Sequence, residues 1–156
     1  MDQTRRNVLK AGGGASMLAL LAAVGMLRPD AALAADANQK AFDAKNLKDA
    51  FDALGAGGRV ESADIAMTAP EIAENGAVVP VGAVSKIPGT ESIAILIANN
   101  PNPLAANFDI PAGTEPGVMT RVKLAQTSEV HVLVKAQGKF YVTKKEIKVT
   151  IGGCGG

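Results

Sequence analysis

Between residues 59 and 151, short apolar stretches are separated by proline, glycine and asparagine, and this pattern constrains the fold more than any other feature. About seven stretches recur at intervals of roughly ten residues. Short strands with frequent turns are typical of an antiparallel β-sandwich. Helices do not alternate with the strands, which disfavours a parallel α/β sheet. We therefore predict a mainly β, immunoglobulin-like sandwich over residues 59–151.

Seven strands are predicted in that range. They span residues 65–68, 77–84, 91–98, 104–110, 119–124, 130–136 and 140–151. The continuous apolar run from Ile93 to Ile97 indicates a central strand that is covered on both faces. Pro80 cannot donate a backbone hydrogen bond, so we predict that its strand lies at a sheet edge or contains a bulge. The turn before that strand is predicted at Asn75-Gly76.

Residues 35–58 are predicted to form an N-terminal helix and a linker. Apolar positions from Phe42 to Leu54 recur with helical spacing, while charged residues fill the other positions. The run of residues 55–58, three of them glycine, ends the pattern. We expect the apolar face to pack on its own domain; the alternative is a surface for a partner. Aliphatic residues must dominate the core, because the chain has four Phe, one Tyr and no Trp.

Residues 1–34 have the features of an export signal. Arg5 and Arg6 precede a glycine-interrupted apolar segment, and Ala32 and Ala34 provide a small-residue cleavage site. The pattern resembles a bacterial twin-arginine signal, although Val8 stands where Phe is usual. A membrane anchor is the alternative, but the apolar segment is short for a span. We therefore expect a periplasmic protein that no longer contacts the membrane after cleavage.

Residues 152–156 read Gly-Gly-Cys-Gly-Gly, and Cys154 is the only cysteine of the chain. Glycine lacks a Cβ, so Gly152, Gly153, Gly155 and Gly156 predict a narrow, flexible arm. The arm follows the last predicted strand, which would fix its origin. An odd cysteine in an oxidising compartment points to intermolecular pairing, covalent loading or a protected thiol. We expect Cys154 to be exposed and chemically used.

Nothing else in the sequence predicts catalysis. His131 is the single histidine, and it stands among valines in a predicted strand. One cysteine and one histidine make a poor metal site, because zinc takes three or four protein ligands. Phosphate-binding and metalloprotease motifs are absent. The formal charge is +1 without a basic patch, which disfavours a nucleic-acid partner. The chain is therefore predicted to be a non-enzyme without metal or cofactor.

Three segments resemble the SoxY family of bacterial sulfur carriers. They are KVTIGGCGG at 148–156, APEIAENGAVVPV at 69–81 and NPNPLA at 100–105. With the twin-arginine signal, the resemblance spans nearly the whole chain. It implies that Cys154 covalently carries S-sulfonate and persulfide intermediates of thiosulfate oxidation. The arm of residues 152–156 would then swing between enzymes.

The resemblance also implies partners. The stable partner would be a SoxZ-like immunoglobulin-fold subunit, forming a heterodimer. The transient partners would be a haem-containing SoxXA-like enzyme that conjugates thiosulfate, a SoxB-like hydrolase that releases sulfate, and a sulfur dehydrogenase. The carrier itself would not be catalytic.

Two other functions remain open from the residues alone. Cys154 could only form an intermolecular disulfide in a periplasmic interaction protein. Alternatively, Gly155-Gly156 resembles the carboxyl end of ubiquitin-like sulfur carriers, although those proteins are cytoplasmic and this chain has an export signal.

Overall fold

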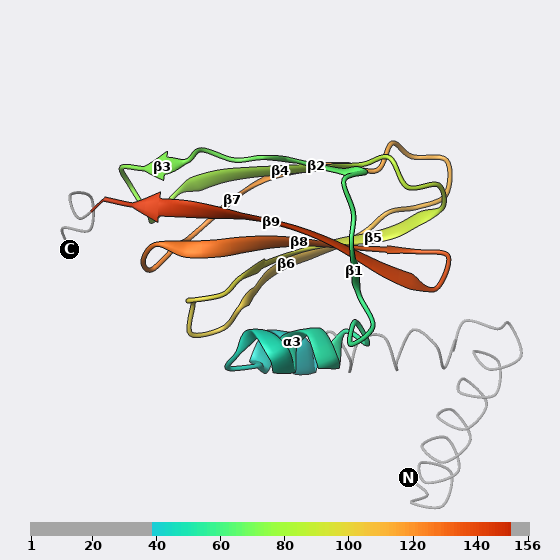
Figure 1. Ribbon diagram of the computed structural model, residues 1–156, viewed down its shortest axis with the longest axis horizontal. Helices are drawn as coiled ribbons and strands as arrows, with labels where there is room; N and C mark the ends of the chain where they lie inside the picture. Colours follow the sequence, from blue (N-terminus) through green and yellow to red (C-terminus); the bar gives the residue numbers. More distant parts are fainter. Residues whose placement is uncertain (1–38, 151–156) are drawn as a thin grey trace, which may run out of the picture. The chain divides into compact units, whose positions relative to one another are not determined.

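The computed structural model describes residues 39–150, so the predicted signal peptide and carrier arm lie outside the described residues. The described part contains the helix α3, a short helical stretch at residues 39–43 and nine strands (Figure 1). These elements are α3 (Leu47–Ala53), β1 (Val60–Glu61), β2 (Ile65–Thr68), β3 (Ile72–Ala73), β4 (Val79–Ser85), β5 (Thr90–Ile97), β6 (Leu104–Asp109), β7 (Gly117–Val122), β8 (Ser128–Ala136) and β9 (Lys139–Val149). No described helix has the length and apolarity that crossing a membrane requires.

The strands form two sheets, which confirms the predicted sandwich. One sheet has the order β1-β9-β8-β5-β6, with β3 also paired to β9, and the other has the order β2-β4-β7. The four long strands of the larger sheet pair antiparallel. Apolar side chains from both sheets meet in buried clusters that include Val79, Val81, Ile95 and Ile147. Each such buried side chain contributes about 1.5–3 kcal/mol of hydrophobic stabilisation.

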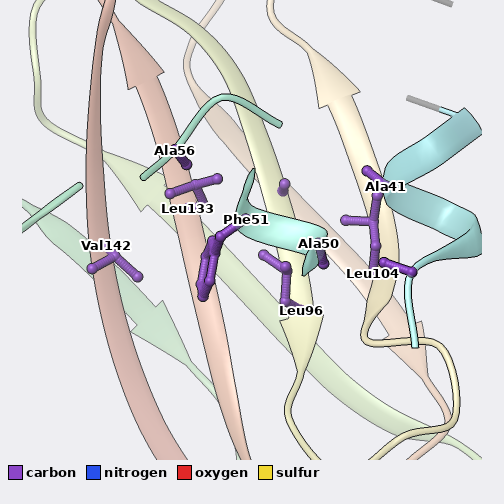
Figure 2. Packing of buried hydrophobic residues seen from close by; sticks show 10 residues of the cluster. Ala41, Ala50, Phe51, Ala56, Leu96, Leu104, Leu133 and Val142 are labelled. Atoms are coloured by element: carbon purple, nitrogen blue, oxygen red, sulfur yellow. The ribbon is translucent and has the colours of Figure 1, made fainter. Parts of the chain in front are cut away.

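Strand β5 is central and covered on both faces, as its continuous apolar run predicts. Ile93, Ile95 and Ile97 point into the core between the sheets. Ala94 and Leu96 point the opposite way, into a cluster with Phe51 of α3 (Figure 2). Successive side chains of a strand alternate between faces, so a strand needs apolar residues at every position only when both faces are buried. The helix supplies the second cover.

The predicted continuous helix is interrupted. Residues 39–43 are helical, the chain breaks over residues 44–46, and α3 begins at Leu47. Asn46 causes the second start, because its side chain accepts a hydrogen bond from the Asp49 N–H at 2.9 Å and so caps α3. Phe42, predicted on the buried face, is 38% exposed, whereas Ala50 and Phe51 are buried against the sheet. Packing of the helix on its own domain is confirmed.

The prediction that Pro80 places its strand at a sheet edge is wrong for β4 as a whole. It is correct for the part of β4 that contains Pro80. Strand β4 lies in the middle of its sheet, between β2 and β7. However, β2 pairs only with the stretch from Gly82 to Ser85, so Pro80 has a strand partner on the β7 side alone. The missing N–H of Pro80 therefore costs no ladder hydrogen bond on the open side.

Two strands of two residues each were not predicted. β1 and β3 both pair parallel with β9, at Val60–Glu61 and Ile72–Ala73. They add short parallel ladders to an otherwise antiparallel sandwich. A two-residue strand is too short to give an alternation of apolar and polar residues, so the sequence offers no periodic signal for either.

The predicted turn at Asn75-Gly76 forms, and Gly76 is also a point of close packing. The Asn75 side chain accepts a hydrogen bond from the Ala77 N–H at 2.9 Å. The Gly76 carbonyl accepts one from the Leu124 N–H at 2.7 Å. A Cβ on Gly76 would lie 2.5 Å from the Leu124 carbonyl oxygen and 3.0 Å from Cγ1 of Val149. The turn therefore approaches the Leu124 carbonyl more closely than a residue with a Cβ allows, and it also lies tightly against Val149 of β9.

Gly76→Ala is expected to destabilise the fold by about 1–3 kcal/mol, because backbone atoms must move to admit the methyl group. Gly58→Ala is the matched control, since a Cβ there meets nothing within 4 Å. Urea unfolding of both variants measures the difference. Equal unfolding free energies would contradict the close approach at Gly76.

Candidate functional site: the root of the C-terminal segment

The predicted site residues, Cys154 with Gly152, Gly153, Gly155 and Gly156, lie outside the described residues. The described chain ends at Thr150, four residues before the cysteine. What the structure defines is the place from which the cysteine-bearing segment starts. We call residues 148–150 the root. Figure 1 shows the tip of β9 beside β3, at one end of the sandwich.

Backbone hydrogen bonds hold the root along one edge. The Lys148 N–H donates to the Glu71 carbonyl at 2.9 Å, and the Thr150 N–H donates to the Ala73 carbonyl at 3.1 Å. Both acceptors flank Ile72 in β3. In a parallel ladder alternate residues use the same edge, so these two bonds belong to one continuous pairing. The unpredicted strand β3 thus keeps the end of β9 from fraying on this side.

A side chain holds the other edge of the root. The neighbouring strand β8 reaches only to Ser128, which pairs with Ile147. Two residues beyond Ile147, the Val149 N–H donates to Oγ1 of Thr127 at 3.0 Å. The Thr127 hydroxyl therefore replaces the carbonyl that a longer β8 would have supplied. This hydrogen bond extends the support of β9 to its last residue.

The asparagine loop after β5 fixes the segment that carries Thr127. The Asn99 side chain donates to the Thr127 carbonyl at 2.8 Å, and its backbone N–H donates to Oγ of Ser128 at 3.0 Å. Asn100 donates to the Lys123 carbonyl at 2.7 Å and accepts from the Ala125 N–H at 3.1 Å. Each asparagine amide can donate and accept, which lets it replace missing backbone partners. The polar loop was predicted, but its link to the root was not.

The side chains of β9 near the root follow the predicted alternation. Ile147 is fully buried, and Val149 packs against the same core cluster. On the other face, Glu146 and Lys148 are exposed. Lys148 also lines a shallow pocket of about 290 Å³, together with Glu71, Ile72, Lys145 and Glu146. The root therefore packs on the apolar core with one face and is bordered on its exposed face by charged groups of both signs.

His131 is not near this site, because it lies in the middle of β8 under the helix. The residue is 8% exposed, and its ring meets Phe51 edge to face, with 5.8 Å between centroids. Nε2 lies 3.5 Å from a carboxylate oxygen of Glu129, without a formed hydrogen bond. Burial lowers the pKa of His131, an effect that the charges of Lys144 and Arg59 reinforce and that of Glu129 opposes. The prediction of a histidine on a sheet face is confirmed.

The described residues offer no other chemical centre that the geometry supports. No cluster of three or more His, Cys, Asp or Glu within residues 39–150 could hold a metal ion. The ion pairs between lysine and a carboxylate there are exposed, such as Lys135 with Glu91 at 2.9 Å. Exposed pairs of this kind contribute little to stability. The candidate site is thus the root and the segment it carries.

Thr127→Val is expected to release the Val149 N–H, because valine keeps the shape of threonine and loses the acceptor. Amide hydrogen exchange at Val149 should accelerate, with a loss of global stability near 0.5–1.5 kcal/mol. Thr127→Ser keeps a hydroxyl and is the control. Unchanged protection of the Val149 amide in Thr127→Val would show that the hydroxyl does not hold the root.

The stability of the protein should fall as the pH drops below the ordinary histidine pKa of 6.5. The folded state binds the His131 proton less readily than the unfolded state, so protons favour unfolding in that window. His131→Phe should flatten this part of the pH dependence. Urea unfolding at several pH values between 8 and 5 makes the comparison, and an equal slope in both proteins would refute it.

The chain matches the family model described as sulfur oxidation protein SoxY over residues 51–154. The match thus ends at Cys154. A solved structure of the sulfur carrier protein SoxY from Chlorobium limicola f thiosulfatophilum is 42% identical, with a TM-score of 0.60. The alignment covers 68% of this chain and 97% of that one.

The human F-spondin reeler domain is more distant, at 10% identity and a TM-score of 0.37, over 60% of this chain and 96% of that one. That likeness is too weak to carry an argument. No curated protein sequence matches the chain. From the family match over two thirds of its length and the related carrier structure, the chain belongs to the SoxY family of sulfur oxidation proteins.

Proposed function

We propose that the protein carries sulfur intermediates covalently on Cys154 during thiosulfate oxidation. The observation that supports this most strongly is the extent of the family match, which runs through the root to Cys154. Cys154 is also the only cysteine of the chain, so no internal disulfide competes for it. The glycines beside it leave the sulfur without neighbouring side chains.

The proposed chemistry needs from this chain only an accessible thiol. In the first step, the thiol sulfur bonds to the outer sulfur of thiosulfate, with loss of one proton and transfer of two electrons to an oxidising enzyme. The product is an S-sulfonate carrying one extra sulfur. Hydrolysis then releases sulfate and leaves a persulfide on Cys154. A further oxidation removes the outer sulfur of this persulfide. Because the thiolate is the nucleophile, an enzyme pocket that lowers the pKa of the thiol speeds loading.

The root gives a physical reason for placing the cysteine here. The strand that precedes it is held by hydrogen bonds on both edges and by core packing. The described strand up to Thr150 therefore needs no further ordering when an enzyme takes the thiol. Ordering each residue costs about 1–2 kcal/mol, which limits how tightly the carrier binds. Weak binding suits a carrier that visits several enzymes in turn.

The proposal includes location and partners. The segment of residues 1–34 would direct export by the twin-arginine route and be removed in the periplasm. The mature chain would form a heterodimer with a SoxZ-like subunit. A haem-containing SoxXA-like enzyme, a SoxB-like hydrolase and a sulfur dehydrogenase would act on the cysteine in turn. These assignments rest on the family and on the signal pattern at Arg5-Arg6.

Cys154→Ser is expected to abolish thiosulfate oxidation by cells that depend on this protein. The fold should be unaffected, because the substitution lies beyond the core and beyond the strand pairing of residues 39–150. Oxygen uptake with thiosulfate measures the activity, and urea unfolding of the purified variant measures the fold. Retained oxygen uptake in the variant would contradict the carrier role.

The alternative function, a disulfide between two chains, needs a separate control. Cys154→Ser would also remove that disulfide. Non-reducing electrophoresis of the wild-type protein during active thiosulfate oxidation distinguishes the two. We expect the monomeric chain to account for the activity; activity confined to a disulfide-linked dimer would favour the alternative.

A further inference from the structure

We propose that the exposed apolar residues Ile72 and Val78, on either side of the turn at Gly76, form the surface on which the enzymes that act on Cys154 dock. This inference rests on the carrier function proposed above and adds the contact surface and the chemistry of its partner. The occupant is the rim of an enzyme pocket, and that rim is apolar. We call Ile72 and Val78 the collar.

The length of the C-terminal segment makes a contact at this end unavoidable. Cys154 lies four positions after Thr150, and an extended chain advances about 3.3–3.6 Å per residue. The cysteine therefore reaches no more than about 14 Å from the end of the described chain. An enzyme whose reacting group lies at the bottom of a pocket must bring the pocket rim against the surface around the root.

Ile72 borders the root directly. It pairs with Lys148 in the parallel ladder, and the carbonyls on either side of it accept the hydrogen bonds from Lys148 and Thr150. Its side chain is nevertheless 57% exposed. A large aliphatic side chain on a two-residue strand at the edge of a sheet gains little from its own fold in that position. Its exposure beside the root is what a docking contact requires.

Val78 lies on the other side of the same turn and is 53% exposed. The turn itself is fixed near the root, because Gly76 approaches Val149 and its carbonyl accepts the Leu124 N–H. The next residue, Val79, is fully buried. The backbone on both sides of Val78 is thus held in place. The collar is consequently a pre-ordered surface, which lowers the entropic cost of docking.

Charged groups of both signs lie beside Ile72. Glu71, Glu146 and Lys148 are exposed and line the same shallow pocket as Ile72. A small apolar centre with a polar rim is the usual arrangement of a protein interface. The two apolar residues are expected to carry most of the docking energy, since fully desolvated centres dominate interfaces and rim charges contribute little.

The sandwich offers a matched control elsewhere. Val84 and Met119 are 43% and 69% exposed, and they lie in β4 and β7 of the smaller sheet. In those strands they pair with Gly117 and Gly82, away from the end where Val79 pairs with Val122. These two residues are as apolar and as exposed as the collar, and they do not border the root. Any general effect of losing exposed apolar surface should appear equally in both pairs.

The test compares the double variants Ile72→Ser/Val78→Ser and Val84→Ser/Met119→Ser in the exported full chain with its co-purifying subunits. The measured quantity is kcat/KM of the thiosulfate-coupling enzyme for each carrier. We expect a fall of about tenfold or more for the collar variant, mainly through KM, and no change for the control variant. Alkylation of Cys154 by iodoacetamide should proceed at the wild-type rate in both, because a small reagent needs no docking surface.

Two results would overturn the proposal: an unchanged kcat/KM for the collar variant, or an equal fall in the control variant. If the collar variant shows both a lower kcat/KM and a lower unfolding free energy, the variant Ile72→Thr/Val78→Thr, which retains β-branching, serves as a further check. A wild-type kcat/KM for that folded variant would also overturn the proposal. The carrier function fails separately. If Cys154→Ser is loaded with sulfur like the wild type, the cysteine is not the carrier. If Cys154→Ser is not loaded but the collar variant keeps the wild-type kcat/KM, only the docking surface is refuted.

Discussion

Strand β9, the last that the structure describes, is held on both edges at its C-terminal end, and the rest of the arrangement depends on this. A C-terminal strand often lies at the edge of a sheet, where its end frays. Here β9 pairs with β8 on one side and with β1 and β3 on the other. Thr127 continues the first of these pairings where β8 stops, and the carbonyls beside Ile72 continue the second. The short parallel strands therefore turn β9 into an interior strand up to the point where the cysteine-bearing segment begins.

The body of the sandwich provides the stiffness behind that strand. β5 is buried on both faces, by the second sheet and by α3, and it pairs with β8, which in turn pairs with β9. The asparagine loop after β5 connects this centre to the segment that carries Thr127. Displacement of the root would thus disturb its hydrogen bonds to the segment around β3 and to Thr127, and its packing in the core. A carrier that delivers its thiol from such a base orders few residues at each visit, in keeping with transient contacts to several enzymes.

The sequence predicted the elements whose signals are periodic and missed those that depend on tertiary contacts. The run from Ile93 to Ile97 identified the doubly covered strand because burial on both faces leaves no polar positions. The break over residues 44–46 was missed, since the apolar spacing continues across it while the capping hydrogen bond of Asn46 starts α3 as a separate helix. β1 and β3 have no pattern of their own, and β9 alone gives them a partner. Thr127 precedes a strand, a position with many possible roles, and only the register of β8 and β9 shows that its hydroxyl is needed. For the proposed carrier cysteine the reverse holds: composition and motif predict Cys154, which lies outside the described residues, and the structure describes only the strand that precedes it.

The most direct measurement is mass spectrometry of the C-terminal peptide from cells supplied with isotopically labelled thiosulfate and then chased with unlabelled thiosulfate. If the protein is a carrier, labelled S-sulfonate and persulfide forms of Cys154 arise during the pulse and disappear during the chase, as labelled sulfate accumulates. A Cys154 that stays unlabelled while labelled sulfate forms, or label confined to the terminal carboxyl group, would contradict the account.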